Sequence, residues 1–188
     1  MSKRLVFLAL ASALVLMSGA VSASTFVALN SRGMVENSDR VVQGRVIGQE
    51  SFWNEDGRLI VTDVTIQVSE TLIGQSSAQV TVRVPGGKVG DLLVVAEGFP
   101  SFEQGSEVIL FLADSPEGDF QRIIGHQQGH FEVVDRLDGV RLAVPQIEEG
   151  TRLFTPSGRL QPQARSTELD EFKNLLRGLG ATAGKIVN

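Results

Sequence analysis

The sequence of 188 residues contains no cysteine. It therefore has no thiol nucleophile, no redox-active cysteine pair and no cysteine ligand for zinc, and no disulfide can stabilise its fold. Tyrosine is also absent and Trp53 is the single tryptophan, which argues against a carbohydrate-binding platform of stacked rings. The fold must depend on ordinary burial of apolar side chains, for which a chain of this length is sufficient.

Long hydrophobic runs are scarce, and the only one stands at the N-terminus. The apolar segment 5–17 follows Lys3 and Arg4 and precedes small residues that end at Ala23. This order is typical of a secretory signal peptide over residues 1–23 that is cleaved after Ala23, and the run is too short for a stable membrane anchor. We therefore predict an exported protein, periplasmic or extracellular, with no transmembrane anchor in the mature chain.

Positive charge is scarce as well. The predicted leader holds two basic and no acidic residues, so the remaining 165 residues hold 15 Lys and Arg against 22 Asp and Glu, a net charge of −7. Nucleic acids and anionic lipids require a concentrated basic surface. We expect no nucleic acid as ligand, and a protein or an envelope component as partner.

Alternation of apolar and polar residues predicts a mainly β domain. In the clearest segment, 59–72, Ile60, Val64 and Ile66 share one face, as in a strand with one buried side. Gly44 and Gly48 interrupt the first strand and indicate bulges. We predict strands at 40–47, 59–72, 79–84, 92–96, 107–113, 120–124, 131–134 and 140–144, with 107–113 as a central strand because it is apolar on both faces.

Helices are expected at both ends of the domain. Residues 24–37 are typical of a short helix or of a loop that leads into one. Ser166 or Thr167 is expected to cap a C-terminal helix that has one apolar stripe and ends at Gly180.

The number of short strands and their glycine-marked bends favour a small antiparallel OB-like Greek-key barrel, with a β-sandwich as the alternative. We predict a barrel domain with an N-terminal helix over residues 24–145, and a loop with a C-terminal helix over residues 146–188.

Three aromatic residues are the predicted binding residues. Phe99 and Phe102 flank a proline in the segment Gly98-Phe-Pro-Ser-Phe102. They either form an exposed tip that binds a partner or plug the end of the barrel. Trp53, at the end of the first hairpin, has the same two interpretations.

His126 and His130 are the only histidines and are four residues apart. A tight turn at Gln127-Gln128 would let them share a metal ion, with Glu132 as a third ligand. The flanking glycines and the surrounding strand pattern favour polar positions beside a turn instead. We therefore predict no metal site and no cofactor, and keep the two histidines as the candidate metal ligands.

No catalytic residue is predicted. The chain lacks a Gly-x-Ser-x-Gly elbow, a Ser-x-x-Lys motif and a His-Glu-x-x-His motif. Paired carboxylates for glycoside hydrolysis come together in space and have no sequence signature; Glu50, Glu55, Asp56 and Asp63 are interpreted as a solvated turn and the polar face of a strand. The chain is thus predicted to be a non-enzymatic binding module, and a hydrolase with unrecognised carboxylates stays open as an alternative.

Several segments of the sequence resemble known protein families. The segments 38–46, 61–74, 84–87, 98–102 and 105–112 resemble a family of uncharacterised exported bacterial proteins. A strand ending in Gly-Arg-Val, followed by a long strand ending in Glu-x-Leu-x-Gly, is also similar to the netrin-like module, the OB-type barrel of metalloproteinase inhibitors. This likeness implies the fold, and it adds a protease inhibitor or protease-associated protein as an alternative function. Those inhibitors present an N-terminal cysteine to the protease zinc, and this chain has no cysteine.

Overall fold

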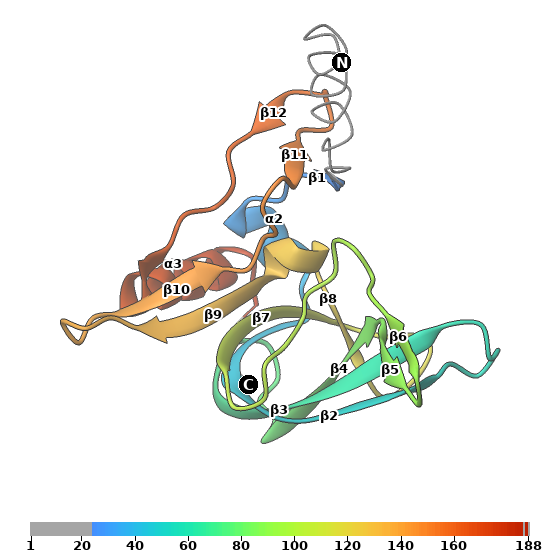
Figure 1. Ribbon diagram of the computed structural model, residues 1–188. Helices are drawn as coiled ribbons and strands as arrows, with labels where there is room; N and C mark the ends of the chain where they lie inside the picture. Colours follow the sequence, from blue (N-terminus) through green and yellow to red (C-terminus); the bar gives the residue numbers. More distant parts are fainter. Residues whose placement is uncertain (1–23, 186, 188) are drawn as a thin grey trace, which may run out of the picture.

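The computed structural model describes residues 24–185 and residue 187 (Figure 1). The predicted signal peptide, residues 1–23, lies outside the described residues. Within the described part, an eight-stranded sheet is accompanied by a three-stranded sheet, a two-stranded sheet and two α-helices. None of these helices is both long and apolar enough to cross a membrane.

Five strands of the large sheet close into a barrel. They are β2 (Arg40–Trp53), β3 (Ile60–Ile73), β4 (Gln79–Pro85), β7 (Glu107–Asp114) and β8 (Gln121–Ile123). β2 pairs with β3 and β7, β3 pairs with β4, and β8 closes the ring by pairing with both β7 and β4. Numbered along the chain, the strands run first, second, third, fifth, fourth around the barrel, and only the contact between β4 and β8 is parallel. The predicted OB-like Greek-key barrel is confirmed, and the β-sandwich alternative is not what forms.

The predicted bulges in β2 are confirmed. The register between β2 and β3 shifts between Gln43 and Gly44 and again between Val46 and Gly48. A Cβ atom on Gly44 would lie 2.5 Å from the carbonyl oxygen of Gln67, so only glycine permits the neighbouring strand to come this close. The bulges bend β2 so that it can serve both the barrel and the ribbon beyond it.

Strand β2 is longer than predicted and continues to Trp53 instead of ending near Ile47. Its last residues pair with the start of β3, as Ser51 with Thr62 and Trp53 with Ile60. These residues show little alternation of their own, and the ladder with β3 holds them extended. The two strands therefore form a two-stranded ribbon that leaves the barrel (Figure 1).

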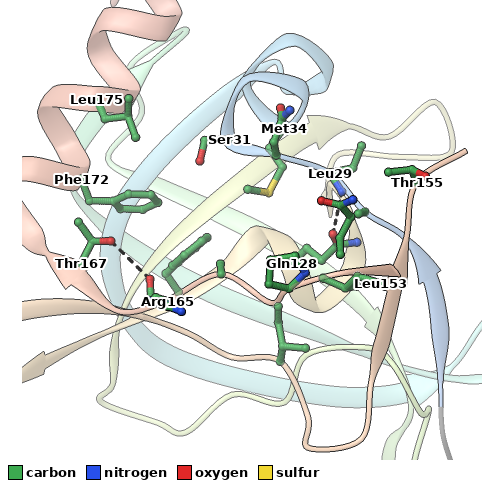
Figure 2. A pocket seen from close by; sticks show the side chains of 17 residues that line it. Leu29, Ser31, Met34, Gln128, Leu153, Thr155, Arg165, Thr167, Phe172 and Leu175 are labelled. Atoms are coloured by element: carbon green, nitrogen blue, oxygen red, sulfur yellow. Dashed lines mark hydrogen bonds between the residues drawn. The ribbon is translucent and has the colours of Figure 1, made fainter. Parts of the chain in front are cut away.

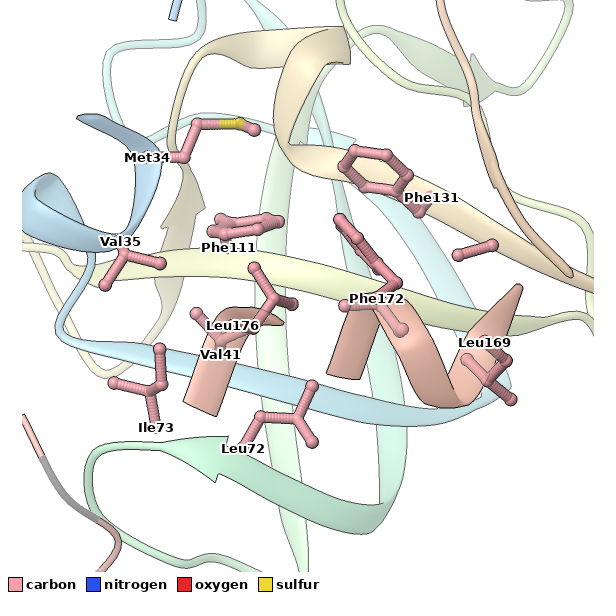
Figure 3. Packing of buried hydrophobic residues seen from close by; sticks show 12 residues of the cluster. Met34, Val35, Val41, Leu72, Ile73, Phe111, Phe131, Leu169, Phe172 and Leu176 are labelled. Atoms are coloured by element: carbon pink, nitrogen blue, oxygen red, sulfur yellow. The ribbon is translucent and has the colours of Figure 1, made fainter. Parts of the chain in front are cut away.

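Two apolar cores result. One fills the barrel and is rich in valine, with Val64, Ile66 and Leu110 fully buried. The other lies between the sheet and the helices α2 (Ser31–Asn37) and α3 (Leu169–Thr182). Figure 3 shows Phe172 and Leu176 of α3 pointing at Phe111 and Phe131 of the sheet. The C-terminal helix thus packs on its own domain.

The predicted end of the C-terminal helix is wrong, because α3 passes through Gly180 to Thr182. A Cβ atom on Gly180 would lie 2.9 Å from the side chain of Ile73, so this glycine lets the helix approach the barrel closely. The predicted cap is also wrong: Glu168 stands at the N-cap position, and its side chain donates or accepts no capping hydrogen bond.

The remaining strands were not all expected. β9 (His130–Asp135), β10 (Arg141–Pro145) and β13 (Thr167–Glu168) extend the large sheet from β7, whereas β1 (Thr25–Val27), β11 (Arg152–Phe154) and β12 (Leu160–Gln161) form the three-stranded sheet. For the segment that contains β1, the sequence predicted a helix or a loop. For the region after Pro145, it predicted a polar loop. β1 pairs in parallel with β11, which lies more than a hundred residues later in the chain. No local pattern in the sequence therefore predicts either strand.

Candidate binding surfaces

The structure separates the predicted binding residues into two groups. Trp53 lies at the end of β2 and is 45% exposed, whereas Phe99 and Phe102 are half-buried in the loop between β6 (Leu92–Val94) and β7. The two phenylalanines meet the two histidines, a combination that the sequence did not suggest.

The loop of Phe99 and Phe102 covers apolar side chains inside the barrel. Phe102 packs against the barrel core, and its carbonyl oxygen accepts a hydrogen bond of 3.1 Å from the Gln49 side-chain amide. Pro100 between the two rings is buried. These contacts match the second of the two predicted interpretations, a plug at the barrel end.

Phe99 and Pro100 also divide the space around this plug. Together they line three neighbouring cavities of about 160, 270 and 380 Å³. The largest of these also reaches the side chains of Arg83 and His126. Phe99 and Pro100 are thus shared by the walls of three separate hollows.

Both histidines serve as ring partners in this region. His126 lies edge-on to Phe99 with ring centroids 4.6 Å apart and also contacts Phe26 of β1. It belongs to a single 3-10 turn, η1 (His126–Gly129), and has a positive φ of 57°. His130 lies against Phe102 with centroids 4.7 Å apart.

Burial controls the charge of the histidines. It lowers the pKa of His126 and lowers the pKa of His130 to about 4 because water no longer solvates the imidazolium. Neither ring nitrogen of His130 has a hydrogen-bond partner among the residues that the structure describes. Within the described residues, no group of three His, Cys, Asp or Glu side chains is arranged to hold a metal ion.

The sequence did not predict a structural role for Gln127 and Gln128, the two glutamines between the histidines. The Gln128 side chain accepts a hydrogen bond of 2.8 Å from the Leu29 amide and donates one of 3.0 Å to the Val27 carbonyl. The Gln127 side chain accepts one of 3.1 Å from the Glu148 amide. Both glutamines are buried, so the segment ties the N-terminal strand and the region after β10 to the barrel. Buried glutamine leaves no periodic signal in a sequence.

An arginine on β4 is held by an acid and two rings. The Arg83 guanidinium donates hydrogen bonds of 2.6 and 2.8 Å to the two oxygens of Asp63 and lies 3.9 Å from the centre of the Phe120 ring and 5.0 Å from that of Phe52. The hydrogen bond with Asp63 raises the pKa of Arg83. Asp63, one of the carboxylates considered for hydrolysis, is thus occupied by an ion pair.

The β5–β6 hairpin presents an exposed apolar surface beside Trp53. β5 (Gly87–Val89) packs on the β2–β3 ribbon (Figure 1), and a Cβ atom on Gly87 would lie 2.4 Å from the Ser51 hydroxyl. Trp53 follows Ser51 on the same face of β2. We call the following side chains the tip surface; each is between 38% and 75% exposed: Trp53, Leu59, Leu92, Leu93, Val94 and Val95.

A groove of about 410 Å³ lies between the helices and the chain segment that leads into α3 (Figure 2). Its floor is apolar and includes Met34, Phe131 and Phe172. Gln128 lines the groove near Leu29. No predicted site residue lies in this groove.

No protein-family model matches this chain, and no curated protein matches its sequence.

Proposed function

We propose that this chain is an exported, non-enzymatic binding module that recognises another protein through the tip surface. The observation that carries the proposal is strand β6, in which every side chain faces solvent although all three are Leu or Val. β6 pairs only with β5 among the described residues. An exposed apolar edge strand favours pairing with another chain, and addition of a partner strand is an established mode of protein recognition.

The chemistry of the hairpin favours a protein over a lipid surface. With the predicted leader removed, the chain has a net charge of −7, and Asp91 at the hairpin turn is exposed. Anionic lipid headgroups would be repelled by this charge. The expected partner contributes an extended segment with apolar side chains.

Site-specific crosslinking tests the proposal. A photo-crosslinking residue at position 93 should capture one discrete partner protein in the cell that exports the chain, and Val95→Asp should abolish that capture. The matched control places the probe at Leu137, a fully exposed apolar residue in the β9–β10 turn, where no capture is expected. Equal capture at both positions, a crosslink to a second copy of this chain, or binding to vesicles in place of a protein would contradict the proposal.

Export is part of the same proposal and has its own test. Protein recovered from outside the cytoplasm should begin at Ser24, which intact-mass measurement determines directly. Recovery of a chain that keeps residues 1–23 would contradict cleavage after Ala23.

The protease-inhibitor alternative is favoured by one observation, the OB-like order of the barrel strands, which is the fold that the netrin-like resemblance implies. Its test is inhibition of exported metalloproteinases at one-to-one stoichiometry. Full protease activity in the presence of excess protein would dispose of it.

A further inference from the structure

The groove at the helices is built differently from the tip surface. Residues 162–166, here called the strap, form one wall before the chain enters β13 and α3. The opposite wall includes Leu29, which precedes α2, and Ser31, the first residue of that helix. Leu175 of α3, which is 50% exposed, extends the apolar lining to the rim (Figure 2).

The charge of the lining is unusual for this acidic protein. Arg165 is the single charged residue that lines the groove, and its guanidinium makes no ion pair or hydrogen bond with any residue in the described part of the chain. The acids that follow in sequence, Glu168, Asp170 and Glu171, do not line it. The Thr167 and Ser31 hydroxyls supply further polar groups.

The strap is weakly held. No backbone–backbone hydrogen bond joins residues 162–166 to the rest of the described chain. Two side-chain bonds fasten it, one of 3.0 Å from the Gln163 amide to the Thr151 carbonyl and one of 3.4 Å from the Thr167 hydroxyl to the Arg165 carbonyl, and its residues are exposed. A segment with so few bonds can shift at little cost in free energy, so a ligand can enter beside it.

We propose that this groove binds an alkyl carboxylate, with the alkyl chain on the apolar floor and the carboxylate at Arg165. Burial of the chain supplies the favourable free energy, and a guanidinium can hold a carboxylate through two parallel hydrogen bonds. The volume of about 410 Å³ is suited to one small ligand. Because the groove has a single cationic group and no acid, it matches a ligand with a single anionic group.

Ligands with the same alkyl chain and different head groups test the proposal. Calorimetric titration of the protein should show binding of decanoate, binding of decan-1-ol that is about fivefold weaker, and still weaker binding of decylammonium, since loss of one partly exposed charge contact costs about that factor in affinity. Arg165→Gln should make decanoate bind about as weakly as decan-1-ol. Ala164→Phe, which fills the groove from the exposed strap, should abolish binding of both.

The control variant is Arg159→Gln. Arg159 is an exposed arginine next to β12 that does not line the groove, so its replacement should leave the affinity for decanoate unchanged. NMR shifts of the Met34 and Leu175 methyl groups locate the ligand. Equal affinities for decanoate and decan-1-ol would overturn the role of Arg165, and failure of both to bind, or binding that survives Ala164→Phe, would overturn the groove as the site. Neither result bears on the tip surface.

Discussion

The guanidinium of Arg83 lies over Phe120 with its central carbon 3.9 Å from the ring centre, while the Asp63 carboxylate accepts hydrogen bonds from two of its nitrogens. Phe120 belongs to the loop that enters β8, and Asp63 belongs to β3. One side chain of β4 thus joins the two neighbours of its own strand, at the place where a single residue pair closes the barrel.

Arg83→Lys should therefore destabilise the barrel although it keeps the charge. A lysine ammonium offers neither the planar face for stacking nor the fork for a bidentate carboxylate, and we expect a loss of about 1–2 kcal/mol in the free energy of unfolding. Denaturant titration measures it. Arg45→Lys is the control, because Arg45 is 58% exposed and lies 3.6 Å from Glu107; its cost should stay below about 0.5 kcal/mol. Equal costs for both variants would refute a special role for Arg83.

His130 should make the stability depend on pH. Its pKa is lowered from 6.5 to about 4 by burial, so between these values the unfolded chain takes up a proton that the folded chain excludes. The contribution of the neutral His130 to the free energy of unfolding is therefore fully present above pH 6.5 and is lost as the pH falls toward 4. The loss between pH 7 and pH 5 should be on the order of 2 kcal/mol.

His130→Leu should remove this part of the pH dependence, measured as the difference between unfolding free energies at pH 7 and pH 5. His126→Leu, at the half-buried histidine, should change the difference less. A wild-type protein whose stability responds to pH in the same way as His130→Leu would show that the imidazole is solvated in the folded state.

Glu70 should anchor the C-terminal helix to the barrel. Burial raises the pKa of its carboxyl, but hydrogen bonds from Lys173 and Arg177 of α3 outweigh burial and lower it. Glu70→Gln should cost about 1 kcal/mol at pH 7. This stabilisation is present above pH 4.5 and is lost as the pH falls further and the carboxylate is protonated, so the two proteins should converge in acid. Glu149→Gln, in an exposed turn, should show no such difference at either pH.

Phe172 and Leu175 on α3 should differ sharply in their effect on stability. Phe172 is 5% exposed and its ring lies 4.6 Å from that of Phe131, so Phe172→Ala should cost about 3–5 kcal/mol. Leu175 is 50% exposed, and Leu175→Ala should cost about 0.5 kcal/mol. Thermal unfolding of both variants compares them. A small effect of Phe172→Ala would mean that the helix does not dock on its own barrel in solution.

The barrel was predictable because each of its longer strands shows a local pattern of apolar and polar residues. In β3, the positions of Val64 and Ile66 alternate with polar residues, and Gly44 marks the bulge that curls its partner. Such patterns arise wherever one face of a strand is buried and the other is exposed to solvent. β1 and β11 have no such pattern, because each is three residues long and its extended form depends on a partner far away in the chain.

By itself, the sequence determined the absence of cysteine chemistry, the acidic charge, the alternation that builds a barrel and the apolar stripe of the final helix. Only the tertiary structure decided that Phe99 and Phe102 meet the two histidines, that Gly180 lies inside a helix, and that Arg165 stands alone at the edge of an apolar groove. The reason is physical. Alternation and capping are properties of neighbouring residues, whereas a pocket or a ring pair is made by segments that meet only after the chain has closed its barrel.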